Sequence, residues 1–361
     1  MFKEITSLKP GKKVSGSIPI KALQFAANEC AKVLTTIFNQ SLQDASFPNE
    51  LKLADIVPTH KRDSHFDKSN YRPISLLPAI SKLFEKLMSN RFQSFVNSFL
   101  SKYLCGFRKG LNCQYALLNM VRKWQSCLSS SGKVGAILMD LSKAFDCLPH
   151  DLLIAKMAAY GFGHHSLKFF LSYLSERKHR VRIGSYLSEF LDFFLGVPQG
   201  AVLGPSLFNI FINDLLLSVT ETDICNLADD NTIYAYDTNI AKVITRLQND
   251  LNFALYRFSI NGLVANPDKF QVIFPGTERS SNNVIKIGDL IFPSTEEVKL
   301  LGITFDRQLT FYPHIQKMCT AEQNQSLTKD QSFFDAKSDR LDFKCLCIFC
   351  FQLLSVSMDV L

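Results

Sequence analysis

Two short apolar segments that each run into aspartate constrain this chain more than any other feature. The first, residues 136–139, is continuously apolar, which is typical of a buried central strand, and Asp140 follows it. The second, residues 224–228, is followed by Asp229 and Asp230. A carboxylate at the end of a buried strand costs free energy unless it is solvated, paired or bound to a metal ion. We therefore expect three carboxylates to meet at one edge of a sheet.

Three clustered carboxylates predict a site for Mg²⁺. This cation takes oxygen ligands, and water and substrate phosphates commonly complete its shell. Two such ions about 4 Å apart activate an attacking hydroxyl and stabilise a leaving oxygen in phosphoryl transfer. The alternative is that Asp229 and Asp230 form an ordinary solvent-exposed turn, because Asp and Asn favour turns. The residues alone leave both interpretations open.

The remaining sequence alternates between helical and extended patterns, which predicts an α+β fold. A polar loop between two extended segments indicates a hairpin, and Pro149 is expected to interrupt or bend a helix. The expected helices cover residues 21–41, 79–99, 141–160, 167–174, 206–217 and 240–260, and the expected strands cover 54–58, 71–77, 136–139, 180–183, 186–194, 224–228, 232–236, 272–274 and 298–305.

Composition excludes several classes of protein. With 47% hydrophobic and 20% charged residues, the chain has material for a core and is not a disordered polypeptide. Its net charge of +7 is compatible with a polyanionic partner without demonstrating one. No apolar run reaches the roughly 18 residues of a membrane span, so we expect no membrane association. The polar, basic start and the irregular cysteine spacing predict free thiols and a protein that is not secreted.

Seven sequence blocks, taken in order, resemble the motifs of reverse transcriptases from non-LTR retrotransposons of the LINE type, and of the jockey-like group in particular. The resemblance extends over about residues 10–315. The blocks are residues 70–77 (NYRPISLL), 105–110 (CGFRKG), 139–146 (MDLSKAFD), 196–208 (GVPQGAVLGPSLF), 227–230 (LADD), 266–269 (NPDK) and 300–303 (LLGI).

This resemblance implies a right-hand polymerase with an antiparallel palm sheet, helical fingers and a truncated or degenerate thumb. After residue 315 the chain leaves the family pattern and ends in a Cys- and Phe-rich segment, in which the spacing of Cys345, Cys347 and Cys350 does not favour a metal site. The implied regions are an N-terminal extension at 1–45, fingers at 46–133, a palm at 134–312 with a fingers insertion near 150–195, and a degenerate thumb remnant or tail at 313–361.

The implied activity is that of an RNA-directed DNA polymerase of a mobile element. It would add deoxynucleotides from dNTPs to a primer 3′-hydroxyl on an RNA template, with two Mg²⁺ ions or with Mn²⁺ in their place. The implied partners are the RNA template, a DNA primer and dNTPs, and the implied location is the nucleus or the cytoplasm. One alternative is a catalytically silent relic that at most binds nucleic acid, because the thumb pattern is lost. Leu227 stands where the family usually has Phe or Tyr, a change that would alter activity without removing a metal ligand. A viral RNA polymerase is another alternative, and Phe145 argues against it.

The resemblance also assigns roles to single residues. Asp140 and Asp229 are the implied catalytic metal ligands, with Asp230 supporting the site. Phe145 stands where the family places an aromatic ring under the sugar, which would exclude a 2′-hydroxyl by steric clash; packing in the core is its alternative role. Gln199 would contact the incoming nucleotide.

Four further positions are implied to serve the nucleotide. Gly200 lets the backbone approach the substrate closely. Lys61 and Arg72 are expected to meet triphosphate charge, Arg72 as a planar fork and Lys61 as a point charge. Lys269 is a candidate general acid for the leaving pyrophosphate. Solvated surface charge is the alternative for Lys61 and Lys269.

Overall fold

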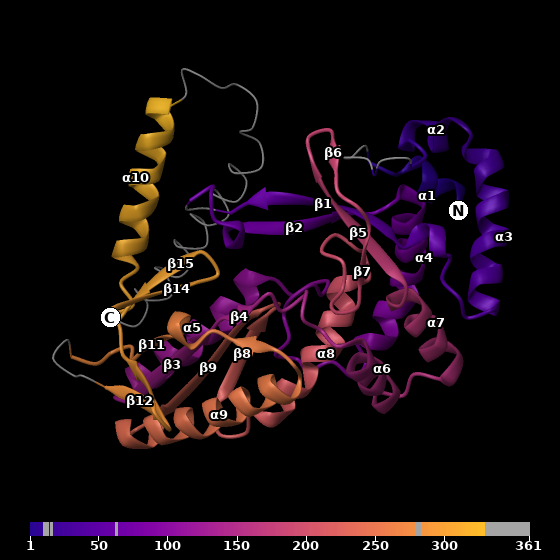
Figure 1. Ribbon diagram of the computed structural model, residues 1–361. Helices are drawn as coiled ribbons and strands as arrows, with labels where there is room; N and C mark the ends of the chain where they lie inside the picture. The colour runs from indigo at the N-terminus through magenta and orange to yellow at the C-terminus, as the bar shows by residue number, and fades with distance from the viewer. Residues whose placement is uncertain (10–13, 15–16, 62–63, 279–282, 329–361) are drawn as a thin grey trace. The chain divides into compact units, whose positions relative to one another are not determined.

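The computed structural model describes residues 1–9, 14, 17–61, 64–278 and 283–328, which combine helices with several sheets (Figure 1). The mixed α and β character predicted from sequence is thereby confirmed. The chain divides into two compact units, and each is described by itself below. Unit 1 comprises Met1–Ser101, Lys143–Asn213 and Ile260–Val264, and unit 2 comprises Lys102–Ser142, Asp214–Ser259 and Ala265–Leu361. Cys345, Cys347 and Cys350 lie outside the described residues.

Unit 1 combines a mixed sheet with most of the N-terminal helices. Its helices are α1 (Phe2–Thr6), α2 (Ile20–Phe25), α3 (Ala27–Gln43), α4 (Ala79–Val96), α6 (His150–Ala159), α7 (His164–Leu174) and the first part of α8 (Gly204–Ser218), with short 3-10 turns η1 (Asn49–Leu51) and η2 (Lys68–Asn70). Its strands are β1 (Leu53–His60), β2 (Tyr71–Leu76), β5 (Arg177–Ile183), β6 (Tyr186–Leu187) and β7 (Leu191–Phe193).

The sheet of unit 1 is built on the expected hairpin. Strands β1 and β2 pair antiparallel from Asp55↔Leu76 to His60↔Tyr71, and β5 joins β1 in parallel. Phenylalanine rings fill the helical layer: Phe84 stacks on Phe38 with ring centroids 4.1 Å apart and on Phe47 at 5.4 Å. Offset ring packing of this kind adds to the stabilisation from apolar burial.

Unit 2 contains the apolar segments that end in aspartate. Its helices are α5 (Cys113–Ser129), the end of α8, α9 (Ile240–Ile260) and α10 (Tyr312–Thr328), with the 3-10 turn η3 (Pro267–Lys269). Its strands are β3 (Lys133–Met139), β4 (Leu141–Ser142), β8 (Asp223–Leu227), β9 (Asp230–Asp237), β11 (Gln271–Ile273), β12 (Val284–Ile287), β13 (Leu290–Pro293), β14 (Glu297–Leu300) and β15 (Ile303–Asp306), while the unit boundary divides β10 (Val264–Ala265).

Four antiparallel strands form the main sheet of unit 2, in the order β11-β3-β9-β8 (Figure 1). Alternate residues of a strand face opposite sides of its sheet. Ala136 of β3 accordingly belongs to the core that contains Trp124 of α5. A Cβ placed on the next residue, Gly135, would lie 2.8 Å from Leu247 of α9. Helices α5 and α9 therefore cover opposite faces of the sheet and shield its strand β3 from solvent.

Most predicted elements match the structure, and the helix predicted over residues 141–160 is wrong in its first half. Residues 141–142 form β4, and Lys143 has a φ of 50°, in the left-handed region that breaks a right-handed helix. The helix begins only after Pro149. Helix α5 was not anticipated, and the helix expected over 21–41 is divided at Ala26 into α2 and α3.

Two predictions from composition can be set against the described residues. Among the helices of that part of the chain, none combines the length and the apolar character that crossing a bilayer requires. The cysteines within it carry free thiols, as predicted: Cys30, Cys105, Cys113, Cys127, Cys147, Cys225 and Cys319.

Candidate active site

The sheet of unit 2 brings the three aspartates to one edge. Strand β3 ends at Met139, which pairs with Asn231 of β9, so Asp140 follows beside the strand that begins with Asp230. Directly opposed residues on antiparallel strands lie about 5 Å apart at their Cα atoms. Asp229 precedes Asp230 in the tight turn between β8 and β9, where Leu227 pairs with Asp230.

Two buried asparagines hold this turn in place. The first residue of the turn, Ala228, has a φ of 59°, a conformation that costs an L-residue roughly 1–2 kcal/mol. Asn226 Nδ2 donates hydrogen bonds to the Ala228 carbonyl at 3.0 Å and to Asn231 Oδ1 at 2.7 Å. Asn231 Nδ2 in turn donates to the Asp229 carbonyl at 3.0 Å. These bonds offset the backbone strain and fix the orientation of Asp229 and Asp230 at the tip of the hairpin.

Residues 105–110 (CGFRKG) lie outside the hairpin and pack against the same turn. Cys105 N donates to the Asn226 carbonyl at 2.9 Å, which lays this segment alongside β8. A Cβ on Gly106 would lie 2.5 Å from the backbone nitrogen of Ala228. No side chain fits there, so the glycine of this motif is explained by close approach to the turn that carries Asp229.

The three aspartates give this edge of the sheet an excess of negative charge. Desolvation, followed by the repulsion of Asp229 and then of Asp140, raises the pKa of Asp230 to about 6. The Asp230 side chain keeps an exposed surface, so water screens part of this repulsion. Lys269 Nζ lies 3.5 Å from Asp140 Oδ2, with both side chains well exposed, which limits the pair to about 1 kcal/mol or less.

A divalent cation fits this donor set. Carboxylate oxygens are its preferred ligands, and a positive ion would relieve the repulsion that raises the pKa of Asp230. Within the described residues, however, no group of three or more His, Cys, Asp or Glu side chains is arranged so that it could hold a metal ion. Mg²⁺ usually binds one or two carboxylates together with waters and substrate phosphates, so a full group of protein ligands is not required for it.

Unit 1 holds a second group of the residues singled out from sequence. Gln199 Nε2 donates to both oxygens of Asp146, at 2.9 and 3.0 Å. The Gln199 carbonyl accepts from Ser75 N of β2 at 2.7 Å. Gly200 has a φ of 127°, and a Cβ on it would meet the Ser75 carbonyl at 2.5 Å. The close backbone approach that Gly200 permits here is made to β2, and its expected approach to the substrate stays a prediction.

The other predicted residues of unit 1 lie near the β1–β2 hairpin or on the loop after β4. Lys61 and Arg72 are exposed, and Arg72 pairs with Thr59 across the hairpin. Phe145 is half-buried and stacks on Phe208 of α8, with ring centroids 4.3 Å apart. That stack fixes the ring of Phe145 and leaves part of it accessible.

Sequence reasoning missed two residues whose hydrogen bonds hold the predicted site residues in place, Asn226 and Asp146. Asn226 interrupts the apolar strand β8, and a buried amide in such a strand signals hydrogen bonds that must be satisfied. Asp146 lies within the quoted block MDLSKAFD, yet nothing in the sequence indicates that its partner is a side chain 53 residues away.

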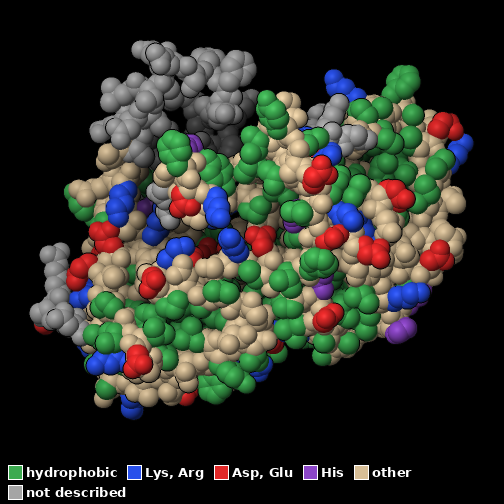
Figure 2. Space-filling model, viewed as in Figure 1, with side chains coloured by type: hydrophobic (Ala, Val, Ile, Leu, Met, Phe, Trp, Pro, Cys, Tyr) green, Lys and Arg blue, Asp and Glu red, His purple; other side chains and the backbone are tan. Residues whose placement is uncertain are grey.

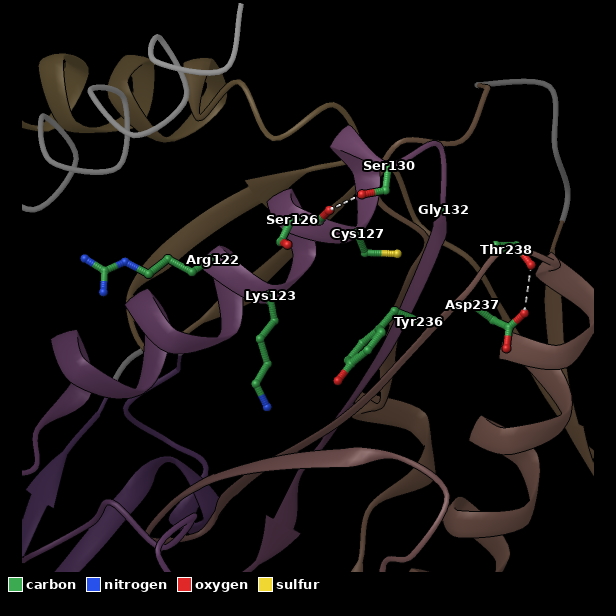
Figure 3. A pocket seen from close by; sticks show the side chains of 9 residues that line it. All are labelled: Arg122, Lys123, Ser126, Cys127, Ser130, Gly132, Tyr236, Asp237 and Thr238. Carbon is green, nitrogen blue, oxygen red and sulfur yellow. Dashed lines mark hydrogen bonds between the residues drawn. The ribbon is translucent and has the colours of Figure 1, made fainter.

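A cavity of about 470 Å³ in unit 2 lies apart from the aspartates (Figure 3). It is lined by Arg122 and Lys123 of α5 and by Tyr236 near the end of β9. Tyr236 is six residues along the strand from Asp230, a separation of roughly 20 Å. Lys123 is also neutralised by Asp223 at 2.8 Å. On the face that Figure 2 shows, basic and acidic side chains are interspersed and form no one-sign patch.

Comparison with known proteins gives one consistent family. The family model described as reverse transcriptase (RNA-dependent DNA polymerase) matches residues 59–305. The RNA-directed DNA polymerase from mobile element jockey of Drosophila melanogaster is 29% identical over 326 residues, covering 87% of this chain and 35% of that protein. Its counterpart from Drosophila funebris is 30% identical over 332 residues, with the same coverage. The chain thus spans about a third of the length of these curated relatives.

Solved structures add support for the fold. An apo telomerase from Candida tropicalis, truncated from its C-terminal domain, is similar with a TM-score of 0.51 at 12% identity, covering 78% of this chain and 59% of that one. A telomerase from Candida albicans, in complex with a fragment of telomeric RNA, gives a TM-score of 0.50 at 11% identity, covering 80% and 49%. At this level of identity the similarity concerns the fold alone.

Proposed function

Because this chain belongs to the reverse transcriptase family, we propose that it is an RNA-directed DNA polymerase of a mobile element. It joins deoxynucleotides from dNTPs to the 3′-hydroxyl of a DNA primer on an RNA template. The observation that carries this proposal is the edge of the unit 2 sheet, where β3 and the β8–β9 hairpin each deliver aspartate. We further propose that it acts in the nucleus or the cytoplasm.

In this proposal Asp140, Asp229 and Asp230 hold the divalent cations, two Mg²⁺ ions or Mn²⁺. When bound, the ions supply charge that activates the primer hydroxyl and stabilises the leaving oxygen. Asp140 and Asp229 are the principal ligands. Asp230, whose pKa is raised towards neutrality, is the supporting carboxylate. Lys269, whose Nζ lies 3.5 Å from Asp140 Oδ2, would be the general acid that gives a proton to the leaving pyrophosphate.

The residues of unit 1 bind and select the nucleotide. Lys61 and Arg72 are exposed cations for the triphosphate, and Gln199 with Gly200 contacts the incoming nucleotide. Phe145, with its ring fixed against Phe208, blocks the space that a 2′-hydroxyl would need. A steric block of this kind selects deoxynucleotides by excluding the competitor.

We assign the regions of the polymerase as the sequence suggests. Residues 46–133 and the insertion near 150–195 serve as fingers and residues 134–312 as palm. Residues 1–45 form an N-terminal extension, and 313–361 form a thumb remnant or tail. The antiparallel sheet β11-β3-β9-β8 supports the palm assignment.

The test is primer extension by the full chain on poly-A template with an oligo-dT primer and dTTP. We expect extension with Mg²⁺ and none after chelation. A folded chain that binds the template–primer but extends nothing with either Mg²⁺ or Mn²⁺ would overturn the proposal. It would establish the alternative, a silent relic that only binds nucleic acid.

A further inference from the structure

Asp146 makes a specific contact that the proposed function does not use. Its two carboxylate oxygens lie 2.9 and 3.0 Å from Nε2 of Gln199. Both residues belong to unit 1. Both side chains are only partly buried, so each keeps an accessible surface.

The backbone on both sides of this contact is held by hydrogen bonds. Val197 N donates to the Phe145 carbonyl at 2.9 Å, and Gly196 N donates to the Leu148 carbonyl at 2.7 Å. The Gln199 carbonyl is tied to β2 through Ser75 N. These bonds anchor the Gln199 loop to the segment that carries Asp146. The backbone is therefore fixed on both sides of the contact between the Gln199 and Asp146 side chains.

The chemistry of the two groups fixes the polarity of the amide. An ionised carboxylate only accepts hydrogen bonds, whereas a glutamine amide has a donating NH₂ and an accepting oxygen. Reversing the amide would set Oε1 against the oxygens of Asp146. Desolvation raises the pKa of Asp146, and the bond from Gln199, followed by the charge of Lys143, opposes that rise and favours the ionised form. His179 and Lys61 add positive charge in the same sense.

We propose that Asp146 is a positioning residue that turns the Gln199 amide so that Oε1, and not the NH₂ group, faces the incoming nucleotide. Gln199 then accepts a hydrogen bond from a donating group of that nucleotide. Asp146 itself touches no substrate in this arrangement. The inference rests on the nucleotide contact proposed above for Gln199.

This arrangement is tested by exchanging the carboxylate of residue 146 and the amide of residue 199. The variants are Asp146→Asn, Asp146→Ala, Gln199→Glu and the double variant Asp146→Asn with Gln199→Glu. Each is assayed for kcat and KM with dTTP on poly-A/oligo-dT and for its melting temperature. Gly163→Ala is the matched control, since a Cβ at that position has no atom within 4 Å.

Each variant has a distinct expected result. Asp146→Ala raises the KM for dTTP about 10-fold with little change in kcat, because the amide loses its charged partner. Asp146→Asn stays within about 3-fold of wild type, because its side-chain oxygen still accepts from Nε2. Gln199→Glu costs about 100-fold in kcat/KM, because it opposes two carboxylates. The double variant recovers at least about 10-fold of that loss, since an amide again donates to a carboxylate and an oxygen still faces outwards.

Two outcomes would overturn the inference. One is a double variant no better than Gln199→Glu alone. The other is an Asp146→Ala variant whose KM changes only in proportion to its melting temperature, as a merely structural residue would behave. Failure of the proposed function looks different, because the wild-type chain would then extend no primer. In that case the same rescue pattern is sought in the binding of fluorescent dTTP to the chain with its template–primer, and its absence rejects the inference.

Discussion

Replacing Gly106 with alanine should displace the turn that carries Asp229. The new Cβ would lie 2.5 Å from Ala228 N and 3.3 Å from Ala228 Cα, whereas ordinary contact begins at 3.4 Å. The clashing atoms are backbone, so no side-chain rotation relieves them, and the turn must move by about 0.9 Å relative to residue 106. Overpacking of this kind typically costs about 1–3 kcal/mol of stability. A displacement near 1 Å at a catalytic group can cost about 100-fold in rate.

The assay combines thermal melting with Mg²⁺-dependent primer extension on poly-A/oligo-dT. Gly163→Ala is the control, because it adds the same methyl group where no atom lies within 4 Å. We expect Gly106→Ala to lose activity far beyond its loss of stability, and Gly163→Ala to resemble wild type. A Gly106→Ala variant with wild-type melting and wild-type rate would refute the close packing of this segment on the turn.

Three further predictions address the turn, the sugar and the pH dependence of folding. Asn226→Ala removes two hydrogen bonds from the buried support of the turn and should cost about 1–3 kcal/mol, measured by denaturant unfolding; an unchanged midpoint would exclude that support. Phe145→Ala should raise the ratio of ribonucleotide to deoxynucleotide kcat/KM, and an unchanged ratio in a folded variant would place the sugar selection elsewhere. Burial lowers the pKa of His150, so the unfolded chain takes up its proton first as the pH falls below about 6.5, and stability declines there. The melting temperature of wild type minus that of His150→Gln should therefore fall from pH 8 to pH 5, because only wild type loses this stabilisation. A rise in that difference would contradict this sign.

The strand pattern around the aspartates was predictable because it depends on local sequence. A continuous apolar run marks the central strand β3, and the turn residues Asp229 and Asp230 mark the hairpin between β8 and β9. The hydrogen bonds that hold the β8–β9 turn were not predictable in the same way. Asn226 gains its role from Asn231, which the register of the hairpin brings opposite to it.

Long-range contacts account for most of what sequence reasoning missed. The reason for Gly106 lies in Ala228, more than a hundred residues later, and only the folded backbone brings the two together. The bond between Asp146 and Gln199 likewise spans two segments that pair through tertiary structure. The error over residues 141–160 has a local cause, since a left-handed residue at Lys143 overrides a favourable helical pattern.

The most direct test of the account is the rate of dTTP addition to oligo-dT on poly-A, with Mg²⁺, by wild type and by Asp229→Asn. The substitution keeps the size of the side chain and removes the charge that would bind the cation. The account predicts a loss of more than about 100-fold in kcat with an unchanged melting temperature, as expected when a catalytic electrostatic contact is removed. A folded Asp229→Asn variant that extends the primer at the wild-type rate would contradict the central claim that these carboxylates carry the catalytic metal.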